Sequence, residues 1–546
     1  MCRILFFIAV YSTNLNFYRM SKEEKTIDLT LIEAVEKTGA FGRFQFVLAF
    51  VYLLAWTVAG MMCIQFQSLS IMQPIQCLSE RCVEVTTAES EPLEQAICQL
   101  EAKDWEYSGD KSNWLTEFEL YCDKAYLKKS GTSIDLTGFL FAAFICGYFS
   151  DKFGRRITNI ICFAAYFVAF MMLKYATVLD EILFLRFMLG AIHGGLSVSL
   201  FTTLIEFTTP VYAWACSVLG ICAFNVGGGI MGYIALERDQ WASTLDIPVC
   251  ISLIGLAICH FVIPETSHWF YAQGKELHAL VALNEAAIIN RSLRLRRTHL
   301  ISLDSAAVES QLDTIFAVTL RTNFLKDAIL RLAWCWFCVA MSYHALRYSK
   351  VPGSNEYYGI MARGVSGVPV SIIMFFTAQK FGANKTAKLF LGLLALALTL
   401  GSIPFLESAM ITSSISVKTL VTCVGRGIAG SLFALLYAYT ASLLPTLSRC
   451  STLGICFTAA AFASILSPGV MFLDALSPML IYAVTIVLAV VSLLVVQKMP
   501  EALHYPLPSN LAECELLFAN RLRDTGLDFT EMENLLVSRE MDETED

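Results

Sequence analysis

The sequence predicts an all-α polytopic membrane protein whose twelve transmembrane helices form two six-helix bundles. The first observation is composition: 56% of the 546 residues are hydrophobic, 16% are charged, and the mean hydropathy is +0.60. Such a chain is too apolar for a soluble protein. The second is that about twelve apolar runs are long enough to cross a bilayer as helices. The third is that a polar stretch at 264–327 divides the runs into two sixes.

The order of the runs gives the domain organisation. The expected spans lie near 44–66, 134–150, 158–179, 182–205, 214–236, 248–263, 328–346, 358–378, 387–405, 418–441, 451–472 and 479–497. The expected domains are an N-terminal segment at 1–43, a first bundle at 44–263 with an extracellular loop at 67–130, the linker at 264–327, a second bundle at 328–497 and an acidic tail at 498–546. The linker contains Arg291, Arg294, Arg296 and Arg297. Because basic loops stay in the cytosol, we expect the linker and both termini there.

Near the start of the chain, the apolar run Ile4–Val10 has the length of a signal-peptide core. No small-residue cleavage site follows it, so we favour an N-terminal extension that precedes a second start at Met20. The net charge of −8 comes largely from the loop and the tail. Neither suggests a polyanion-binding surface, and we expect no nucleic-acid partner.

Four of the eighteen cysteines lie in the loop at 67–130: Cys77, Cys82, Cys98 and Cys122. Facing an oxidising space, they are expected to form two disulfides, and three pairings remain open. Free thiols are the alternative. The other cysteines are mostly single residues in apolar runs and are interpreted as small packing residues. The two glycosylation sequons, at Asn290 and Asn384, lie on the expected cytosolic side and should not be used.

A short turn at 151–156 joins the second and third runs. Gly154 allows a tight bend between two helices, and Arg155 and Arg156 hold the turn in the cytosol. Asp151 lies at a helix end, where it can pair with a base or with the N-terminal dipole of another helix. The turn, D-K-F-G-R-R, resembles the signature of the major facilitator superfamily, whose members carry small solutes across membranes. The alternative is a chance basic turn.

Further motifs resemble the organic cation and anion transporter family. Residues 39–45 are similar to its G-x-F-G-R-F-Q motif, and residues 264–269 to its P-E-S-P-R-W motif. Pro445, Thr446 and Arg449 match its L-Y-P-T-x-x-R motif. The large cysteine-bearing loop is also typical of the family. The resemblance implies the major facilitator fold, with a cavity lined by the first, fourth, seventh and tenth helices.

The sequence departs from the family pattern at the cytosolic side. The second bundle's copy of the turn, at 379–384, is Q-K-F-G-A-N and lacks the acid. Glu206 remains at the end of the fourth span, but its usual arginine partner is Ala213, and the corresponding acid after the tenth span is Ser442. The resemblance therefore implies a reduced charged lock. The residues assigned to gating are Asp151, Gly154, Arg155, Arg156, Glu206 and Arg449.

Ionisable residues within spans are costly and are candidates for substrate binding. Arg186 and Arg426 lie near the outer ends of the fourth and tenth spans, where each lines the cavity or snorkels to the outer interface. Asp135 and Arg363 occupy matching depths in the two repeats, and we consider a joint substrate role for them. The alternative is a structural bond or a place at the outer interface.

Two positions where the family carries charges are neutral here. In the family, an acid on the eleventh helix accompanies cation transport and a base accompanies anion transport, but this chain has Ala461. Gly367 likewise replaces an acid before the proline of the eighth helix. We therefore expect simple permanent cations to be disfavoured. Zwitterionic or weakly anionic solutes fit better if Arg363 faces the path.

Aromatic residues are the other binding candidates. The seventh helix contains Trp334, Trp336, Phe337 and Tyr343, followed by His344. On the tenth helix, Phe433 and Tyr437 share a face at i and i+4. Their ring faces can hold a cation or a flat organic molecule. The alternative for each is packing or contact with lipid.

We expect a transporter of small organic solutes, either organic ions or zwitterions, that works by alternating access around a central site. Transport would be facilitative or secondary active, because the sequence has no G-x-x-x-x-G-K-[ST] loop for ATP. No cofactor, metal site or enzymatic activity is expected. The alternative is a transporter-like receptor, regulator or scaffold without transport, which the altered turn at 379–384 and the uncharged Ala461 would favour.

The tail contains E-M-E-N-L-L at 531–536. Glu531, Leu535 and Leu536 resemble the acidic dileucine signal E-x-x-x-L-L, which clathrin adaptors bind. The alternative is the apolar stripe of a short helix, or no function. We expect the protein in the plasma membrane, and also in endosomal membranes if the signal works. Its other partners are the solute and the lipid bilayer.

Overall fold

A computed structural model describes most of the chain. The described residues are 27–87, 97–101, 103–108, 111–295, 298–300, 322–347, 356–403, 410–412, 415–470, 478–502, 507–508 and 514. Several predictions concern residues outside these ranges: the run Ile4–Val10, the start at Met20, Arg296, Arg297, and the adaptor signal at Glu531, Leu535 and Leu536. Those predictions therefore remain predictions.

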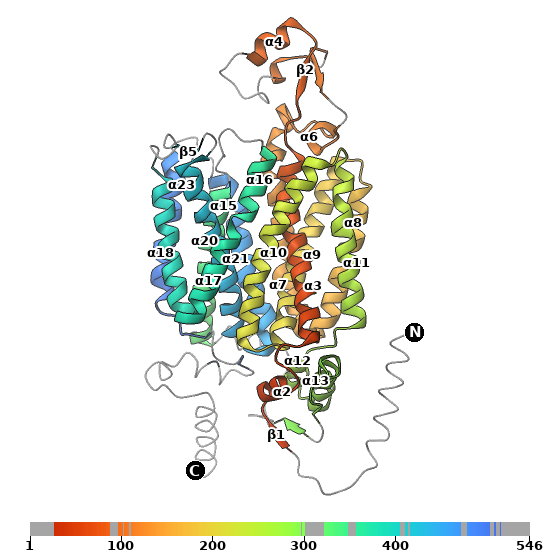
Figure 1. The fold of residues 1–546 in the computed structure, drawn as a ribbon, viewed down its shortest axis with the longest axis vertical. Coiled ribbons are helices and arrows are strands. Elements are labelled where there is room, and N and C mark those ends of the chain that lie inside the picture. The colour runs from red at the N-terminus through yellow and green to blue at the C-terminus, as the bar shows by residue number, and fades with distance from the viewer. Residues whose placement is uncertain are drawn as a thin grey trace.

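The first bundle consists of long, uninterrupted helices of apolar and small residues. They are α3 (Arg43–Leu69), α7 (Ala125–Phe153), α8 (Arg155–Lys174), α9 (Leu179–Glu206), α10 (Pro210–Glu237) and α11 (Asp246–Phe261). Figure 1 shows them side by side, coloured from red to yellow-green. Pro210 occupies the first turn of α10, where its missing N–H has no intrahelical partner to lose.

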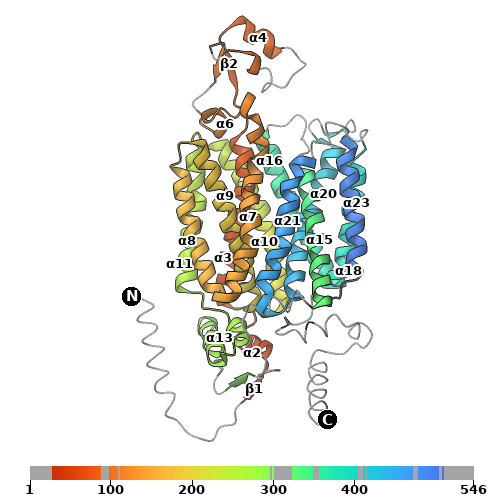
Figure 2. The same ribbon diagram turned by 180° about the vertical axis from the view of Figure 1, so that it is seen from behind.

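The second bundle stands beside the first, coloured green to blue in the opposite views of Figures 1 and 2. It contains α15 (Asn323–Arg347), α16 (Glu356–Val365), α17 (Gly367–Phe381), α18 (Ala383–Gly401), α20 (Val417–Ser442), α21 (Arg449–Val470) and α23 (Pro478–Val496). Before α20, the short strands β5 (Met410–Thr412) and β6 (Ile415–Ser416) pair antiparallel.

The predicted twelve-span fold is confirmed. Among the described residues, ten helices are long and apolar enough to cross a membrane. α15 and α23 complete the twelve, although the first turns of α15 contain Lys326, Asp327 and Arg331, whose charges lower its hydropathy. The chain is therefore a multi-pass membrane protein.

The eighth span is broken into α16 and α17. Pro369 has no N–H to donate to the carbonyl of Val365, so the helix cannot continue through this point without a defect. Both α16 and α17 pack against α10. There Gly364 lies so close to Gly229 that a Cβ would come within 2.8 Å of the Gly229 nitrogen.

At one end of the bundles, the linker side, the chain forms a small helical layer below the spans in Figure 1. Its helices are α2 (Leu31–Lys37), α12 (Ser267–Ala272) and α13 (Glu276–Asn290). Strand β1 (Ile27–Leu29) pairs in parallel with β4 (Thr298–Leu300), which joins the segment before α3 to the linker. The Asn290 side chain accepts a hydrogen bond from the Phe44 N–H at 2.8 Å and donates one to the Thr38 carbonyl at 3.2 Å. This sequon asparagine therefore has a structural role.

At the opposite end, the loop side, the chain between α3 and α7 forms a raised cap (Figure 1). It contains α4 (Glu80–Thr87), α6 (Trp114–Glu117) and the antiparallel strands β2 (Ile75–Cys77) and β3 (Trp105–Tyr107). Disulfides join Cys77 to Cys82 and Cys98 to Cys122, which answers the question of pairing that the sequence left open. Helical structure extends into both ends of the predicted loop 67–130, since α3 continues to Leu69 and α7 begins at Ala125, whereas the apolar span within α7 begins at Ser133.

Small residues let the two bundles approach each other. Near the linker side, Gly454 of α21 lies against α7, where a Cβ would come within 2.6 Å of the Ala143 carbonyl oxygen. Gly147 of α7 lies equally close to the Cys450 carbonyl. Backbone contacts this short require glycine. The cavity that concerns function lies between these contacts and the α10–α16 contact toward the loop side.

Candidate functional site

A cavity of about 160 Å³ lies between the bundles. Its mostly apolar wall with a few polar side chains is typical of a small-molecule site. Its walls come from α3, α7, α9, α10, α15, α20 and α21. The resemblance implied only four of these helices, the first, fourth, seventh and tenth spans. The structure adds α7, α10 and α21, because the second, fifth and eleventh spans also face the gap between the bundles.

Aromatic side chains form much of the wall. The predicted Trp336, Tyr343, His344, Phe433 and Tyr437 all line the cavity. The Trp336 ring lies 5.6 Å from that of Phe433 and 6.1 Å from that of Tyr437, centroid to centroid. Its indole N–H donates to the Thr440 hydroxyl at 3.0 Å, so its polar atom is satisfied. Trp334 is 37% exposed and does not line the cavity.

Other lining residues were not found from the sequence: Tyr52, Trp56, Phe139, His193, Phe224 and Phe457. An aromatic residue in a span has the same pattern whether it faces lipid, a neighbouring helix or the cavity. No sequence signal would have separated them. His193 carried a weak signal, because it is a titratable residue within a span.

Asp135 lines the cavity and is paired with Arg186. The guanidinium also donates to the Gln65 side chain and, at 3.0 Å, to the Met62 carbonyl, both on α3. It lies 5.7 Å from the Trp114 ring of α6. The Arg186 side chain is fully buried, which excludes the alternative that it snorkels to the outer interface. It does not line the cavity either; it neutralises Asp135 from behind.

Arg426 is buried behind the opposite wall. It donates a hydrogen bond to the Tyr343 hydroxyl at 2.9 Å, and its guanidinium carbon lies 5.0 Å from the centre of that ring. Within the described part of the chain, no carboxylate lies within 4 Å of it. Like Arg186, it neither snorkels nor lines the cavity, since its exposed fraction is 4%. Tyr343, which lines the cavity, therefore lies between the Arg426 guanidinium and the open space.

Three other positions were singled out from the sequence for their charge or lack of it: Ala461, Gly367 and Arg363. Ala461 lines the cavity and adds no charge to its wall. Gly367 lies against the Asn225 side chain of α10. Arg363 is in α16, but its side chain is outside the described part of the structure, and its predicted role with Asp135 remains a prediction.

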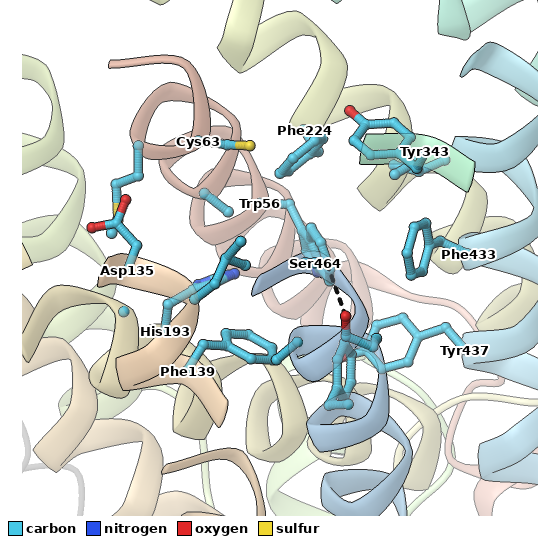
Figure 3. A pocket seen from close by; sticks show the side chains of 18 of the residues that line it. Trp56, Cys63, Asp135, Phe139, His193, Phe224, Tyr343, Phe433, Tyr437 and Ser464 are labelled. Atoms are coloured by element: carbon cyan, nitrogen blue, oxygen red, sulfur yellow. Dashed lines mark hydrogen bonds between the residues drawn. The ribbon is translucent and has the colours of Figure 1, made fainter. Parts of the chain in front are cut away.

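Figure 3 shows the arrangement of the cavity. Asp135 and His193 lie on one wall, and Tyr343, Phe433 and Tyr437 lie on the opposite wall. The first wall belongs to the first bundle and the second wall to the second bundle. The cavity is therefore lined by both bundles.

On the linker side, buried charges connect the bundles. Asp151 accepts hydrogen bonds from the Ser451 N–H at 2.8 Å and its hydroxyl at 2.6 Å, at the N-terminus of α21. It also pairs with Arg155 at 3.1 Å. Both partner types expected for Asp151, a base and a helix dipole, are present.

Glu206 is the centre of this network. It pairs with Arg155 at 3.3 Å and with Arg449 at 3.0 Å, and it accepts a hydrogen bond from the Thr266 hydroxyl at 2.6 Å. The expected loss of its partner holds at Ala213, but Arg449 supplies the charge from the other bundle. We call Asp151, Arg155, Glu206 and Arg449 the linker-side charge network.

The glycine turns repeat in both bundles. Gly154 has φ +104° and Gly382 has φ +84°, a conformation that favours glycine. After Gly154, the Glu265 carboxylate accepts hydrogen bonds from the N–H groups of Arg155 and Arg156 at 2.9 and 3.1 Å. After Gly382, Glu501 accepts the corresponding bonds from α18 at 2.8 and 3.0 Å. The second turn has lost its aspartate but kept this carboxylate.

Burial changes the titration of groups beside the network. It raises the pKa of the Glu265 carboxyl, against the opposing effect of the backbone N–H donors. It lowers the pKa of His268 to about 4, although the nearby Glu206 carboxylate opposes the shift. His268 is therefore neutral near pH 7. Among the described residues, no cluster of three or more histidine, cysteine or acidic side chains could hold a metal ion.

Similarity to known protein families shows the superfamily to which the chain belongs. Residues 130–468, more than half of the chain, match the family model of the Major Facilitator Superfamily. The chain belongs to the major facilitator superfamily.

Curated relatives and solved structures agree with this assignment. Organic anion transporter 3 of Oryctolagus cuniculus is 25% identical over 427 residues, covering 76% of each chain. Solute carrier family 22 member 13 of Homo sapiens is 26% identical, covering 76% of this chain and 73% of the relative. The proton:xylose symporter XylE has a TM-score of 0.60 at 16% identity, covering 87% of this chain and 99% of XylE. The human organic anion transporter MFSD10 has a TM-score of 0.56 at 14% identity, covering 83% and 99%.

The predicted kinship with the organic cation and anion transporters is confirmed by these relatives. As a superfamily member, the protein transports solutes, and none of the relatives named above favours the alternative of a non-transporting receptor or scaffold. The relatives named above are transporters, not enzymes.

Proposed function

We propose that the protein carries small organic anions with an aromatic or apolar body by alternating access. The observation that carries this proposal is Arg426, a buried guanidinium beside the cavity without a carboxylate partner in the described part of the chain. A buried charge without a counter-ion is costly. An anionic solute would supply the missing counter-charge each time it binds.

The other charges of the cavity support this sign. Asp135 is neutralised by Arg186, and Ala461 adds no charge. Arg426 therefore dominates the electrostatics of the wall it backs. Because the surroundings are apolar, its field is weakly screened.

Tyr343 would connect Arg426 to the solute by a chain of two hydrogen bonds. Its oxygen accepts a hydrogen bond from Arg426, which leaves its own hydroxyl hydrogen available to donate toward the cavity. Hydrogen bonds in such a chain strengthen one another. The aromatic rings of Trp336, Phe433 and Tyr437 would hold the flat body of the solute.

We further propose that the linker-side charge network is the gate that closes one end of the pathway. Its members join α7, α8 and α9 of the first bundle to α21 of the second. Release on that side requires these contacts to break. Gly154 and Arg156 would act by holding the turn, since Arg156 donates to the His260 carbonyl at 2.9 Å.

We propose that the linker side faces the cytosol of a plasma-membrane protein. The basic residues of the linker and the turn at 151–156 support this orientation. Both termini would then be cytosolic. The dileucine signal at Glu531, Leu535 and Leu536 would be accessible to clathrin adaptors and would add an endosomal pool.

The proposal for anions has a direct test in proteoliposomes that contain the purified protein. Naphthalene-2-sulfonate is a fluorescent, permanently charged aromatic anion, and tetraethylammonium is a permanent cation. We expect saturable uptake of the sulfonate above that of protein-free vesicles, and at least tenfold lower uptake of tetraethylammonium. Preferred uptake of the cation would overturn the proposal.

A further inference from the structure

His193 offers a hydrogen-bonding group on the wall opposite Tyr343. It lies on α9, about one turn after Gly190 and two turns after Arg186, both of which pack against α7, and its ring lines the cavity. Edge contacts with Trp56 at 5.9 Å and tilted contacts with Phe139 at 5.7 Å fix the ring. Figure 3 shows it pointing from α9 toward Trp56 and Ser464.

The Nδ1 atom of His193 is buried and makes no hydrogen bond within the described part of the chain. A buried polar atom without a partner costs free energy, and native structures contain few of them. The neighbouring polar groups form hydrogen bonds or ion pairs elsewhere and make none with Nδ1. The Tyr166 hydroxyl donates to the sulfur of Met62 at 3.3 Å, and Asp135 is engaged by Arg186.

Three further polar side chains of the cavity wall already have backbone partners. Ser217 donates to the Ala434 carbonyl at 2.7 Å, Ser464 to the Ala460 carbonyl at 2.8 Å, and Tyr437 to the Ser197 carbonyl. The Tyr52 hydroxyl makes no hydrogen bond within the described residues, but it lies against Gly220 of α10 rather than in the open part of the cavity.

We propose that His193 is a specificity-determining residue, which hydrogen-bonds a polar group at the end of the organic anion opposite the end held by Tyr343 and Arg426. This inference rests on the proposed function. A neutral imidazole can donate or accept, so a hydroxyl or an amide suits it. The preferred solutes are then aromatic anions with a hydrogen-bonding group far from the negative charge. Such a solute would bridge the first bundle, through His193, and the second, through Tyr343.

Two rigid sulfonates differ only in the group that this inference requires. In 6-hydroxynaphthalene-2-sulfonate the hydroxyl lies at the end opposite the charge, and naphthalene-2-sulfonate lacks it. Binding of both is measured at equilibrium with the full-length protein in lipid nanodiscs. We expect the wild type to bind the hydroxylated compound about tenfold more tightly, the usual effect of one buried hydrogen bond.

Variants assign this preference to His193. His193→Leu should abolish it while still binding naphthalene-2-sulfonate, and His193→Gln, which keeps a hydrogen-bonding side chain, should retain part of it. His193→Phe keeps an aromatic ring beside Trp56 and repeats the test if the leucine variant does not fold. The matched control is His278→Leu, an exposed histidine on α13 away from the cavity, which should behave as the wild type.

The outcomes separate the two claims. If the wild type binds both sulfonates without preference, or if His193→Leu and His193→Phe keep the preference, the inference about His193 is overturned and the proposed function stands. If the wild type binds neither sulfonate, the proposed function is overturned, and the inference with it.

Discussion

At the scale of single residues, buried charges in this protein are arranged in two ways. In the linker-side charge network, every member has a partner on another helix, and Glu206 is shared by two arginines. Around the cavity, by contrast, Arg426 has a tyrosine as its partner. The first arrangement stabilises a closed contact, and the second leaves a charge to be met by a ligand.

Glu206→Gln tests the network. Removing this carboxylate leaves Arg155 and Arg449 buried without their shared partner, which costs about 3–5 kcal/mol for comparable buried pairs. We expect a clearly lower midpoint of thermal unfolding in detergent, together with greater access of thiol reagents to Cys450. Glu237→Gln, at the exposed end of α10, is the control. An unchanged midpoint in Glu206→Gln would contradict the role given to the network.

His268 makes stability depend on pH. Its pKa is lowered to about 4 by burial, so between about pH 6.5 and 4 the unfolded chain binds a proton that the folded protein does not. Stability contributed by neutral His268 is therefore lost as the pH falls through this window. At pH 5 the loss is about 2 kcal/mol.

The measurement is the difference in unfolding midpoint between pH 7.5 and pH 5. His268→Gln, which does not titrate, should show a smaller decrease than the wild type. This comparison also removes the contribution of Glu265, which is the same in both proteins. Equal decreases would mean that His268 is protonated in the folded state or is accessible to water.

Some of these residue contacts could be predicted from the sequence, and others could not. The pairing of Asp151 followed from its place at a helix end beside basic residues. The pairing of Glu206 with Arg449 did not, because it joins positions 243 residues apart on different bundles. Arg186 and Arg426 look alike in sequence, and only the packed structure shows that Arg186 has a carboxylate partner whereas Arg426 has none among the described residues.

At the scale of elements, close contacts between bundles depend on glycine. The crossing of α10 and α16 uses Gly229 and Gly364. Gly364→Val should disrupt it, since overpacking costs about 1–3 kcal/mol, and should lower transport because the bundles can no longer close there. The measurements are the unfolding midpoint and uptake of naphthalene-2-sulfonate.

A matched control exists on α18. A Cβ at Gly392 would have no neighbour within 4 Å, so Gly392→Val should have little effect on either measurement. If both valine variants behave alike, the effect belongs to valine in a helix and not to the crossing.

Element positions were the most predictable feature of the chain. Apolar length located all twelve spans, because a membrane helix needs a continuous run of apolar residues. The break in the eighth span could have been expected from Pro369 but was not. The choice of lining helices was incomplete, since the rotation of a helix about its axis depends on its neighbours, and apolar spans carry little amphipathic signal.

At the scale of the whole molecule, the two bundles repeat one design with different charges. Each has a glycine turn whose following helix is held by a carboxylate, Glu265 in the first bundle and Glu501 in the second. The aspartate and arginines of the turn remain only in the first. Three members of the linker-side charge network, Asp151, Arg155 and Glu206, therefore lie in the first bundle, and Arg449 of α21 lies in the second. At the cavity, Arg426 of the second bundle is the positive charge that has no carboxylate partner among the described residues.

The central claim is that Arg426 selects anions, and uptake by its variants tests it most directly. Purified wild type, Arg426→Lys and Arg426→Gln are reconstituted at equal amounts of folded protein, and uptake of naphthalene-2-sulfonate and tetraethylammonium is compared. We predict that Arg426→Gln lowers sulfonate uptake at least tenfold, because the counter-charge is lost, while Arg426→Lys retains a substantial part of it. Sulfonate uptake by Arg426→Gln equal to that of the wild type would contradict the account.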